Sequence, residues 1–186
     1  MLIAKLKKET NIAEYILYMW QIEDIIRSYK FDLELIDQHV VAKYPQPLEV
    51  KEQIKEWYAE LIEIMQSEGL EQSGHLSYII EDIKGLGILH QTLLTTIQDK
   101  DHKDNYEIAK IHIAELMQRG DGKYINEIDA CLTGLYGLML LRLRNKPVSD
   151  PTRVSMECIS KFLAHLVAQY NKLKTGQLKL SEEQNN

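Results

Sequence analysis

Apolar residues recur along most of this chain at intervals of three and four, the spacing that places them on one face of an α-helix. The segment 48–67 is the clearest example, because Val50, Ile54 and Leu61 fall on one stripe while its glutamates lie largely away from it. The same spacing predicts helices at about 11–30, 32–44, 48–67, 74–98, 104–119, 123–145 and 150–174. We therefore predict an all-α fold, a single compact bundle of six to seven helices.

Capping signals mark several of these boundaries. Asn11 precedes the first helix and Glu14 follows three residues later, which is the spacing of a capping box. Residues 99–103 are charged throughout or carry histidine, and we expect them to connect two helices. Asp150 followed by Pro151 predicts the start of the last helix, with Asp150 as the N-cap and Pro151 in the first turn.

The segment 123–145 differs from the others because it is apolar on nearly all sides. Such a helix is expected in the middle of a bundle, where neighbouring helices cover every face. Gly134 and Gly137 lie inside it, and each lowers helix stability by about 1 kcal/mol relative to alanine. Close approach of a neighbouring helix is the simplest physical reason for these glycines. We therefore predict that this is the most buried helix, with a tight crossing at Gly134 or Gly137.

The size and composition of the chain fit one folded unit. A chain of 186 residues matches the usual length of a single domain. Its 9 glycines and 4 prolines provide too few turns for a sandwich or barrel of many strands. We predict one helical domain over residues 1–175, followed by a polar, flexible tail over residues 176–186.

The charge balance and the two cysteines limit the partners and the location. The 28 acidic and 22 basic residues give a net charge of −6, the opposite of what a nucleic-acid-binding domain needs, so we expect no nucleic-acid partner. No apolar run reaches 18 residues, so we expect no membrane partner. Cys131 and Cys158 are far apart and flanked by apolar residues, as buried side chains are. We predict a cytoplasmic protein.

Several polar residues interrupt the apolar stripes, and they are the candidate site. Glu23 and Arg27 are four residues apart in the acid-first order that favours an ion pair on a helix. The full set that falls within stripes is Glu23, Arg27, Asp37, His90, Asp129 and Tyr136. One explanation is that these groups satisfy one another inside a packed core, which we favour. The alternative is that they converge in a polar core pocket that binds a ligand.

Metal binding is the sharpest chemistry that carboxylates and one imidazole could support inside a bundle. The spacing argues against it, because no Glu-x-x-His pair is present and the nearest motif is the reversed pair His112 and Glu115. We assign that pair to a solvated face or a local hydrogen bond. No phosphate-binding loop, dinucleotide fingerprint or nucleophile elbow occurs either. We therefore predict no metal ligand and no catalytic residue, and the identity of any cofactor is unknown.

Two segments resemble a known family. Residues 11–27 read NIAEYILYMWQIEDIIR and residues 127–137 read EIDACLTGLYG. Both are similar to an uncharacterised family found in Bacteroidetes, catalogued as domain of unknown function 4924. The resemblance covers about residues 1–175. It implies an all-helical bacterial protein, and it transfers no functional residue.

The function is not determinable from the sequence, but two interpretations can be compared. The first is a cytoplasmic helical-bundle interaction module that forms a homodimer, because helix 11–30 carries more apolar surface than a small bundle requires. The alternative is a bundle that binds a small molecule or a metal, with or without enzymatic activity, in a pocket lined by the six polar residues. A transcription regulator is disfavoured by the acidic balance.

Overall fold

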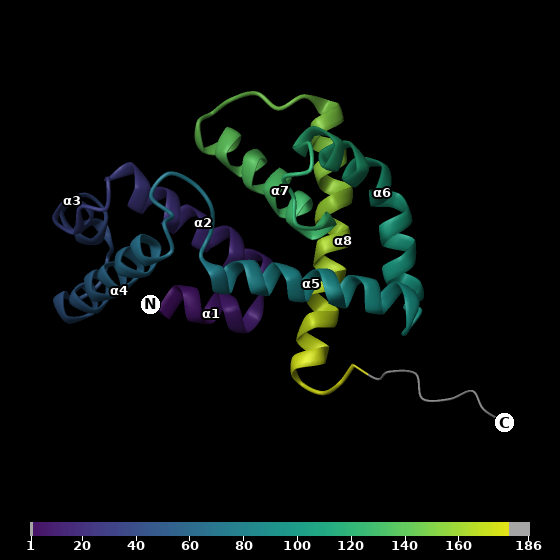
Figure 1. Ribbon diagram of the computed structural model, residues 1–186, viewed down its shortest axis with the longest axis horizontal. Helices are drawn as coiled ribbons and strands as arrows, with labels where there is room; N and C mark the ends of the chain where they lie inside the picture. The colour runs from purple at the N-terminus through teal and green to yellow at the C-terminus, as the bar shows by residue number, and fades with distance from the viewer. Residues whose placement is uncertain (1, 179–186) are drawn as a thin grey trace. The chain divides into compact units, whose positions relative to one another are not determined.

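The computed structural model describes residues 2–178, and in this range the chain is helical and contains no strand (Figure 1). The α-helices are α1 Leu2–Thr10, α2 Ile12–Ser28, α3 Leu33–His39, α4 Leu48–Ser67, α5 Ser77–Thr95, α6 Lys100–Gly120, α7 Glu127–Leu143 and α8 Asp150–Lys174, with a 3₁₀ turn η1 at Val41–Lys43. None of these helices combines the length and apolar character needed to cross a bilayer. The all-α prediction is confirmed.

The predicted number of helices was too low, because eight α-helices are present among the described residues instead of six or seven. The additional one is α1, whose apolar stripe is too short to stand out in the sequence. Asn11, in an extended backbone conformation, separates it from α2. Asn11 Oδ1 accepts a hydrogen bond from the Glu14 backbone N–H at 3.1 Å, and Asn11 Nδ2 donates to Glu14 Oε1 at 3.2 Å. The predicted capping pair is therefore confirmed.

Two other helix starts differ from the prediction. Residues 99–103 are not a connector, because Asp99 is the N-cap of α6 and accepts a hydrogen bond from the His102 backbone N–H at 2.7 Å. The charged residues that suggested a loop are the first turn of the helix. At α8 the N-cap is Ser149 and not Asp150, and Pro151 lies in the first turn as expected.

The described chain divides within α5 into two units, which meet between Glu81 and Asp82. In the first unit, α1 packs on α2, and α3 and η1 pack on α4. Helix α2 supplies most of the large, fully buried side chains of this unit, namely Ile12, Ile16, Met19, Trp20, Ile22 and Ile26. The single domain expected over residues 1–175 stays a prediction. Residues 179–186 of the predicted tail lie outside the described residues.

The second unit is built on α6 and α8, which run side by side, with α7 packed on both. A Cβ atom at Gly134 would lie 2.9 Å from Leu116 Cδ1 of α6 and 3.4 Å from Met156 of α8. The predicted tight crossing therefore occurs at Gly134, whereas a Cβ at Gly137 would meet no neighbouring atom. The prediction that this helix is the most buried is wrong, since α2 has more buried residues and Leu143 of α7 is 66% exposed.

Candidate ligand pocket in the second unit

The Glu23 carboxylate is completely buried in the first unit, where it holds the start of α5. Its Oε1 accepts a hydrogen bond at 3.0 Å from the backbone N–H of Leu76, the residue before α5. Its Oε2 lies 2.6 Å from His75 Nδ1 and 3.8 Å from Arg27 Nη2. The first N–H groups of a helix have no partner within the helix, so a carboxylate at this point stabilises the helix start.

Arg27 extends this arrangement to the segment between α4 and α5. Its Nε donates to the Leu70 carbonyl at 3.0 Å, its Nη2 donates to the Gly74 carbonyl, and its Nη1 lies 3.1 Å from Asp24. The sequence thus brings Glu23 and Arg27 together as predicted. Their other partners are largely backbone groups, so the geometry favours the core-packing explanation for this pair.

Three other residues of the predicted set have no part in these contacts of Glu23 and Arg27. Asp37 lies 2.8 Å from Lys55 Nζ, and this hydrogen bond raises the pKa of Lys55. Asp129 accepts a hydrogen bond from the Ile125 backbone N–H at 3.0 Å, which is a role at the start of α7. Tyr136 is half-buried on α7. The partners of Asp37 and Asp129 in these contacts, Lys55 and Ile125, are not among the six predicted residues.

His90 lies in the core of the second unit and is the centre of a chain of polar side chains. Its Nδ1 is 2.8 Å from His102 Nε2, and its Nε2 is 3.3 Å from Glu127 Oε2. Glu127 Oε1 accepts a hydrogen bond from the Tyr106 hydroxyl at 3.0 Å. Phe162 packs its ring edge to face against His90, with ring centroids 5.2 Å apart. A carboxylate, two imidazoles and a phenol from α5, α6 and α7 therefore meet around one aromatic side chain of α8.

The burial of His102 determines where the ring protons of the two histidines lie. Burial, reinforced by the neighbouring His90, lowers the pKa of His102 to about 4, so His102 is neutral at pH 7. If its single ring proton were on Nδ1, it would have no acceptor, because Nδ1 is buried without a hydrogen-bond partner among the described residues. On Nε2 the same proton is donated to His90 Nδ1. We therefore assign it to Nε2, which leaves His90 to carry its own proton on Nε2, facing Glu127.

Beyond His102, this row of polar side chains continues to α8. His102 and His165 have ring centroids 5.6 Å apart, and His165 Nε2 lies 3.3 Å from Asp99 Oδ1. Gln169 Nε2 donates to Asp99 Oδ2 at 2.9 Å. Asp99 therefore caps α6 and also fixes two side chains of α8. The described residues contain no group of three or more histidine, cysteine or acidic side chains with the geometry of a metal site.

His90 and Glu127, at one end of this row of polar side chains, line a pocket of about 690 Å³. Its walls come from α5, from the end of α6 and from the start of α7. The lining residues are Lys84, Gly87, Ile88, His90, Gln91, Thr92, Thr95, Met117, Ile125, Asn126 and Glu127. Pockets of this volume are typical of small-molecule sites, in which a few polar groups converge among apolar side chains. This pocket is the candidate site.

Gly87 lets the start of α7 approach α5 at this pocket. A Cβ atom at Gly87 would lie 2.4 Å from Asn126 Nδ2, so a larger residue would displace the Asn126 side chain. Asn126 is the N-cap of α7, and its Oδ1 accepts hydrogen bonds from the Ile128 and Asp129 backbone N–H groups. Glu127 follows Asn126 directly, and this places its carboxylate opposite His90, one turn along α5 from Gly87.

Glu127 is suited to binding more than to proton transfer. The contact with His90 lowers the pKa of its carboxyl group, and the Tyr106 hydroxyl lowers it further. Burial raises the pKa of Tyr106 to about 12, so Tyr106 keeps its proton and stays a donor. A general base works best when its pKa lies near the working pH. A carboxylate with a depressed pKa is instead a permanent negative charge on the pocket wall.

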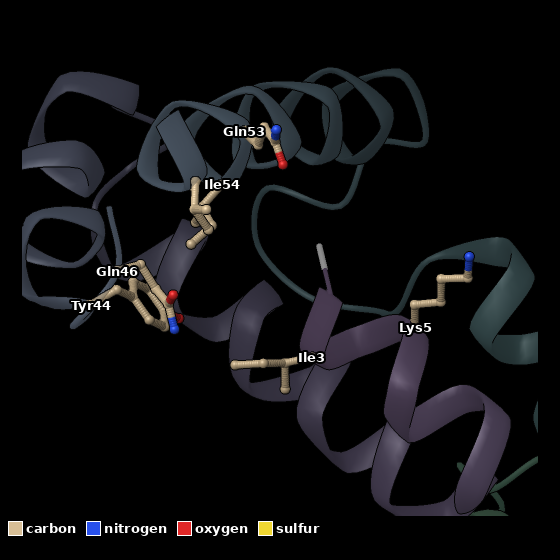
Figure 2. A pocket seen from close by; sticks show the side chains of 7 residues that line it. Ile3, Lys5, Tyr44, Gln46, Gln53 and Ile54 are labelled. Carbon is tan, nitrogen blue, oxygen red and sulfur yellow. The ribbon is translucent and has the colours of Figure 1, made fainter. Parts of the chain in front are cut away.

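A second pocket lies in the first unit, between α1 and α4 (Figure 2). It encloses about 290 Å³ and is lined by Ile3, Lys5, Tyr44, Gln46, Val50, Gln53 and Ile54. Figure 2 shows Ile3 directed toward Tyr44 and Gln46, with Lys5 farther along α1. None of its polar lining side chains is buried. A ligand in this pocket would therefore meet no buried charged group that could orient it.

The apolar stripe of its helix points to His90, but no such pattern points to the residues around it. The charged run predicts a connector at Asp99 and His102, although aspartate is also a common N-cap, and Asp99 takes that role at the start of α6. Glu127 was passed over because it begins a helix beside Asp129, where acidic residues usually only complement the helix dipole. No pattern in the sequence pairs Tyr106 with Glu127, since their contact joins two helices.

Comparison with known proteins identifies a family but not an activity. No curated protein and no solved structure matches the chain. The match that is found covers residues 1–177, and its description names no reaction, ligand or partner. The chain belongs to the family described as Domain of unknown function (DUF4924).

Proposed function

We propose that the second unit is a binding module for a small organic molecule, which occupies the pocket lined by His90 and Glu127. One observation carries the proposal. His90 is 98% buried, yet it lies on the wall of an open pocket, and its Nε2 faces Glu127 at 3.3 Å without the alignment of a hydrogen bond. Burying polar atoms without a full set of partners is unfavourable unless they are used. The Glu127 side chain is itself 34% exposed and lines the pocket, so a ligand there would contact the residue to which one of these atoms belongs.

Binding is favoured over catalysis by the same geometry. His90 Nδ1 accepts a hydrogen bond from His102 and Nε2 carries the ring proton, so neither nitrogen is free to take a proton from a substrate. The depressed pKa of Glu127 makes it a weak base. Cys131 is fully buried, and burial raises the pKa of its thiol, so it is not an activated nucleophile.

The test is a fragment screen on the full-length protein by heteronuclear NMR. We expect hits that shift the amide signals of Gln91, Ile125 and Glu127, and we expect Glu127→Gln to weaken those hits at least tenfold. The matched control is Glu157→Gln, the same change at an exposed position of α8 away from the pocket, which should leave binding unchanged. A broad screen without any hit at these signals would reject the proposal.

A second function, self-association, is favoured by α6. Ile108 and Ile111 lie three residues apart, so they share a face of this helix, and both are more than 60% exposed. Apolar side chains exposed together often mark a protein interface. The homodimer expected from the sequence would use this face. Light scattering of the wild type and of Ile108→Glu would test it, and a wild type that is monomeric over a wide concentration range would exclude it.

The expected location and partners follow the sequence analysis. Both cysteines are free thiols, which supports the proposal of a cytoplasmic protein. The net charge of −6 supports the absence of a nucleic-acid partner.

A further inference from the structure

The charge on the wall of the pocket narrows the class of ligand. A carboxylate offers about four acceptor positions. At Glu127 the described partners are the Tyr106 hydroxyl at 3.0 Å and His90 Nε2 at 3.3 Å. The Glu127 side chain is still 34% exposed, on the side of the pocket. Because Oε2 is buried, a group in the pocket would reach this carboxylate at Oε1, which keeps an acceptor position beside the Tyr106 hydroxyl.

The sign of the charge favours a cationic group over an anionic one. The contact with His90 and the Tyr106 hydrogen bond keep the Glu127 carboxyl ionised. A carboxylate in a partly desolvated site attracts an ammonium group more strongly than in open water, and it repels an anion. Asp129, in the same first turn of α7, is a second acidic group at this helix start, but it does not line the pocket.

Lys84, which also lines the pocket, disfavours a second positive charge on the ligand. Lys84 and His90 are both on α5, six residues apart, which corresponds to about 9 Å along the helix axis. A ligand that places one ammonium group at Glu127 and extends along α5 brings its far end toward Lys84. A second positive charge there would be repelled.

Beside its polar lining residues, the pocket has an apolar lining that is partly exposed. Ile88 is 69% exposed and Ile125 is 44% exposed, and Met117 completes this lining. Covering such side chains with a hydrocarbon chain removes apolar surface from water, which favours binding. The pocket therefore combines one fixed negative charge with an apolar surface beside it.

From this combination, and on the basis of the proposed function, we infer that the ligand is an amine with a single positive charge and an apolar body. Its ammonium group donates to Glu127, and its hydrocarbon part packs on Ile88, Met117 and Ile125. Tyr106 and His90 act as positioning residues that hold the carboxylate.

Four probes of matched length test this inference by NMR titration of the full-length protein: hexylamine, hexan-1-ol, hexanoate and 1,6-diaminohexane. We expect hexylamine to shift the signals of Gln91, Ile125 and Glu127, with an affinity about tenfold above that of hexanol. Hexanoate should bind more weakly than hexanol, and the diamine more weakly than hexylamine. Glu127→Gln should remove the preference for hexylamine over hexanol, whereas Glu157→Gln should keep it.

The outcomes separate the inference from the function on which it rests. If hexanol or hexanoate binds at these signals as well as hexylamine does, the pocket binds ligands but the inferred class is wrong. If hexylamine keeps its preference in Glu127→Gln, the assigned anchor is wrong. If none of the four probes shifts these signals, the inference is rejected, and the fragment screen alone then decides the proposed function.

Discussion

Each unit places a carboxylate against a histidine, and the two arrangements differ in what surrounds them. Glu23 in the first unit is buried and contacts His75, a backbone N–H and Arg27, which in turn binds two backbone carbonyls. Glu127 in the second unit is partly exposed in a pocket, and its described partners are side chains. A polar group that binds backbone fixes the path of the chain. A polar group held by side chains beside a pocket is available to a ligand.

The largest effect that tests this comparison is expected at Arg27. Arg27→Ala would leave the buried Glu23 carboxylate with less compensating charge and would strand the Leu70 and Gly74 carbonyls. Removing one partner of a buried ion pair typically costs about 3–5 kcal/mol. Urea denaturation measures this loss. Arg153→Ala, which breaks an exposed pair with Asp150, should cost at most about 1 kcal/mol. Equal stability of Arg27→Ala and wild type would assign the Glu23 region to a ligand instead of to the fold.

A pH effect of about 3 kcal/mol is expected in the second unit. Folded His102 takes up a proton only near pH 4, whereas the unfolded chain does so near pH 6.5. The unfolded state therefore binds more protons in this window, so stability is full above pH 6.5 and falls as the pH decreases toward 4. At 1.36 kcal/mol per pKa unit the loss from this group is about 3 kcal/mol.

His102→Gln is the matched variant for this measurement. Its side-chain amide can still donate a hydrogen bond to His90 but does not titrate. The denaturation midpoint should decrease less between pH 7 and pH 4.5 in the variant than in the wild type. The same decrease in both proteins would show that His102 is already charged in the folded state.

A smaller effect separates two glycines of α5. Gly87→Ala should destabilise the protein by about 1–2 kcal/mol, because its Cβ would meet Asn126 and displace the N-cap of α7. Gly85 is exposed and a Cβ there meets no neighbouring atom, so Gly85→Ala should stabilise the helix by up to about 1 kcal/mol. Thermal denaturation of the two variants checks the opposite signs. A neutral Gly87→Ala would mean that α7 need not lie close to α5 at the pocket.

The smallest change in stability is expected for Glu127→Gln, within about 1 kcal/mol of the wild type. The amide oxygen can still accept from Tyr106, and the partial exposure of the side chain limits the desolvation involved. This variant should bind an amine ligand at least tenfold more weakly while it keeps its denaturation midpoint. A decrease of several kcal/mol would place Glu127 with Glu23, as a residue that holds the fold.

How much the sequence predicts depends on whether the partners share a helix. The pairing of Glu23 with Arg27 and the capping of α2 by Asn11 were predictable, because both depend on the fixed spacing of residues along a helix. The burial of His90 was also visible in the apolar stripe of its helix. Its contacts with His102 and Glu127 were not, since they depend on how three helices pack. The prediction that α7 is the most buried helix is wrong for the same reason, because its apolar composition does not indicate which half of the helix has neighbours.

The position of the boundary between the units has a consequence for dissecting the protein. It falls between Glu81 and Asp82, one turn inside the uninterrupted helix α5, and not in a loop. A protease needs an extended segment, so limited digestion should cut in the connections around residues 70–76, 121–126 or 145–149 and spare the boundary itself. Separate expression of residues 1–81 or 82–186 would divide α5 and remove from each part some of the backbone hydrogen bonds that complete this helix. The chain is thus better studied whole, with each unit addressed by point substitutions.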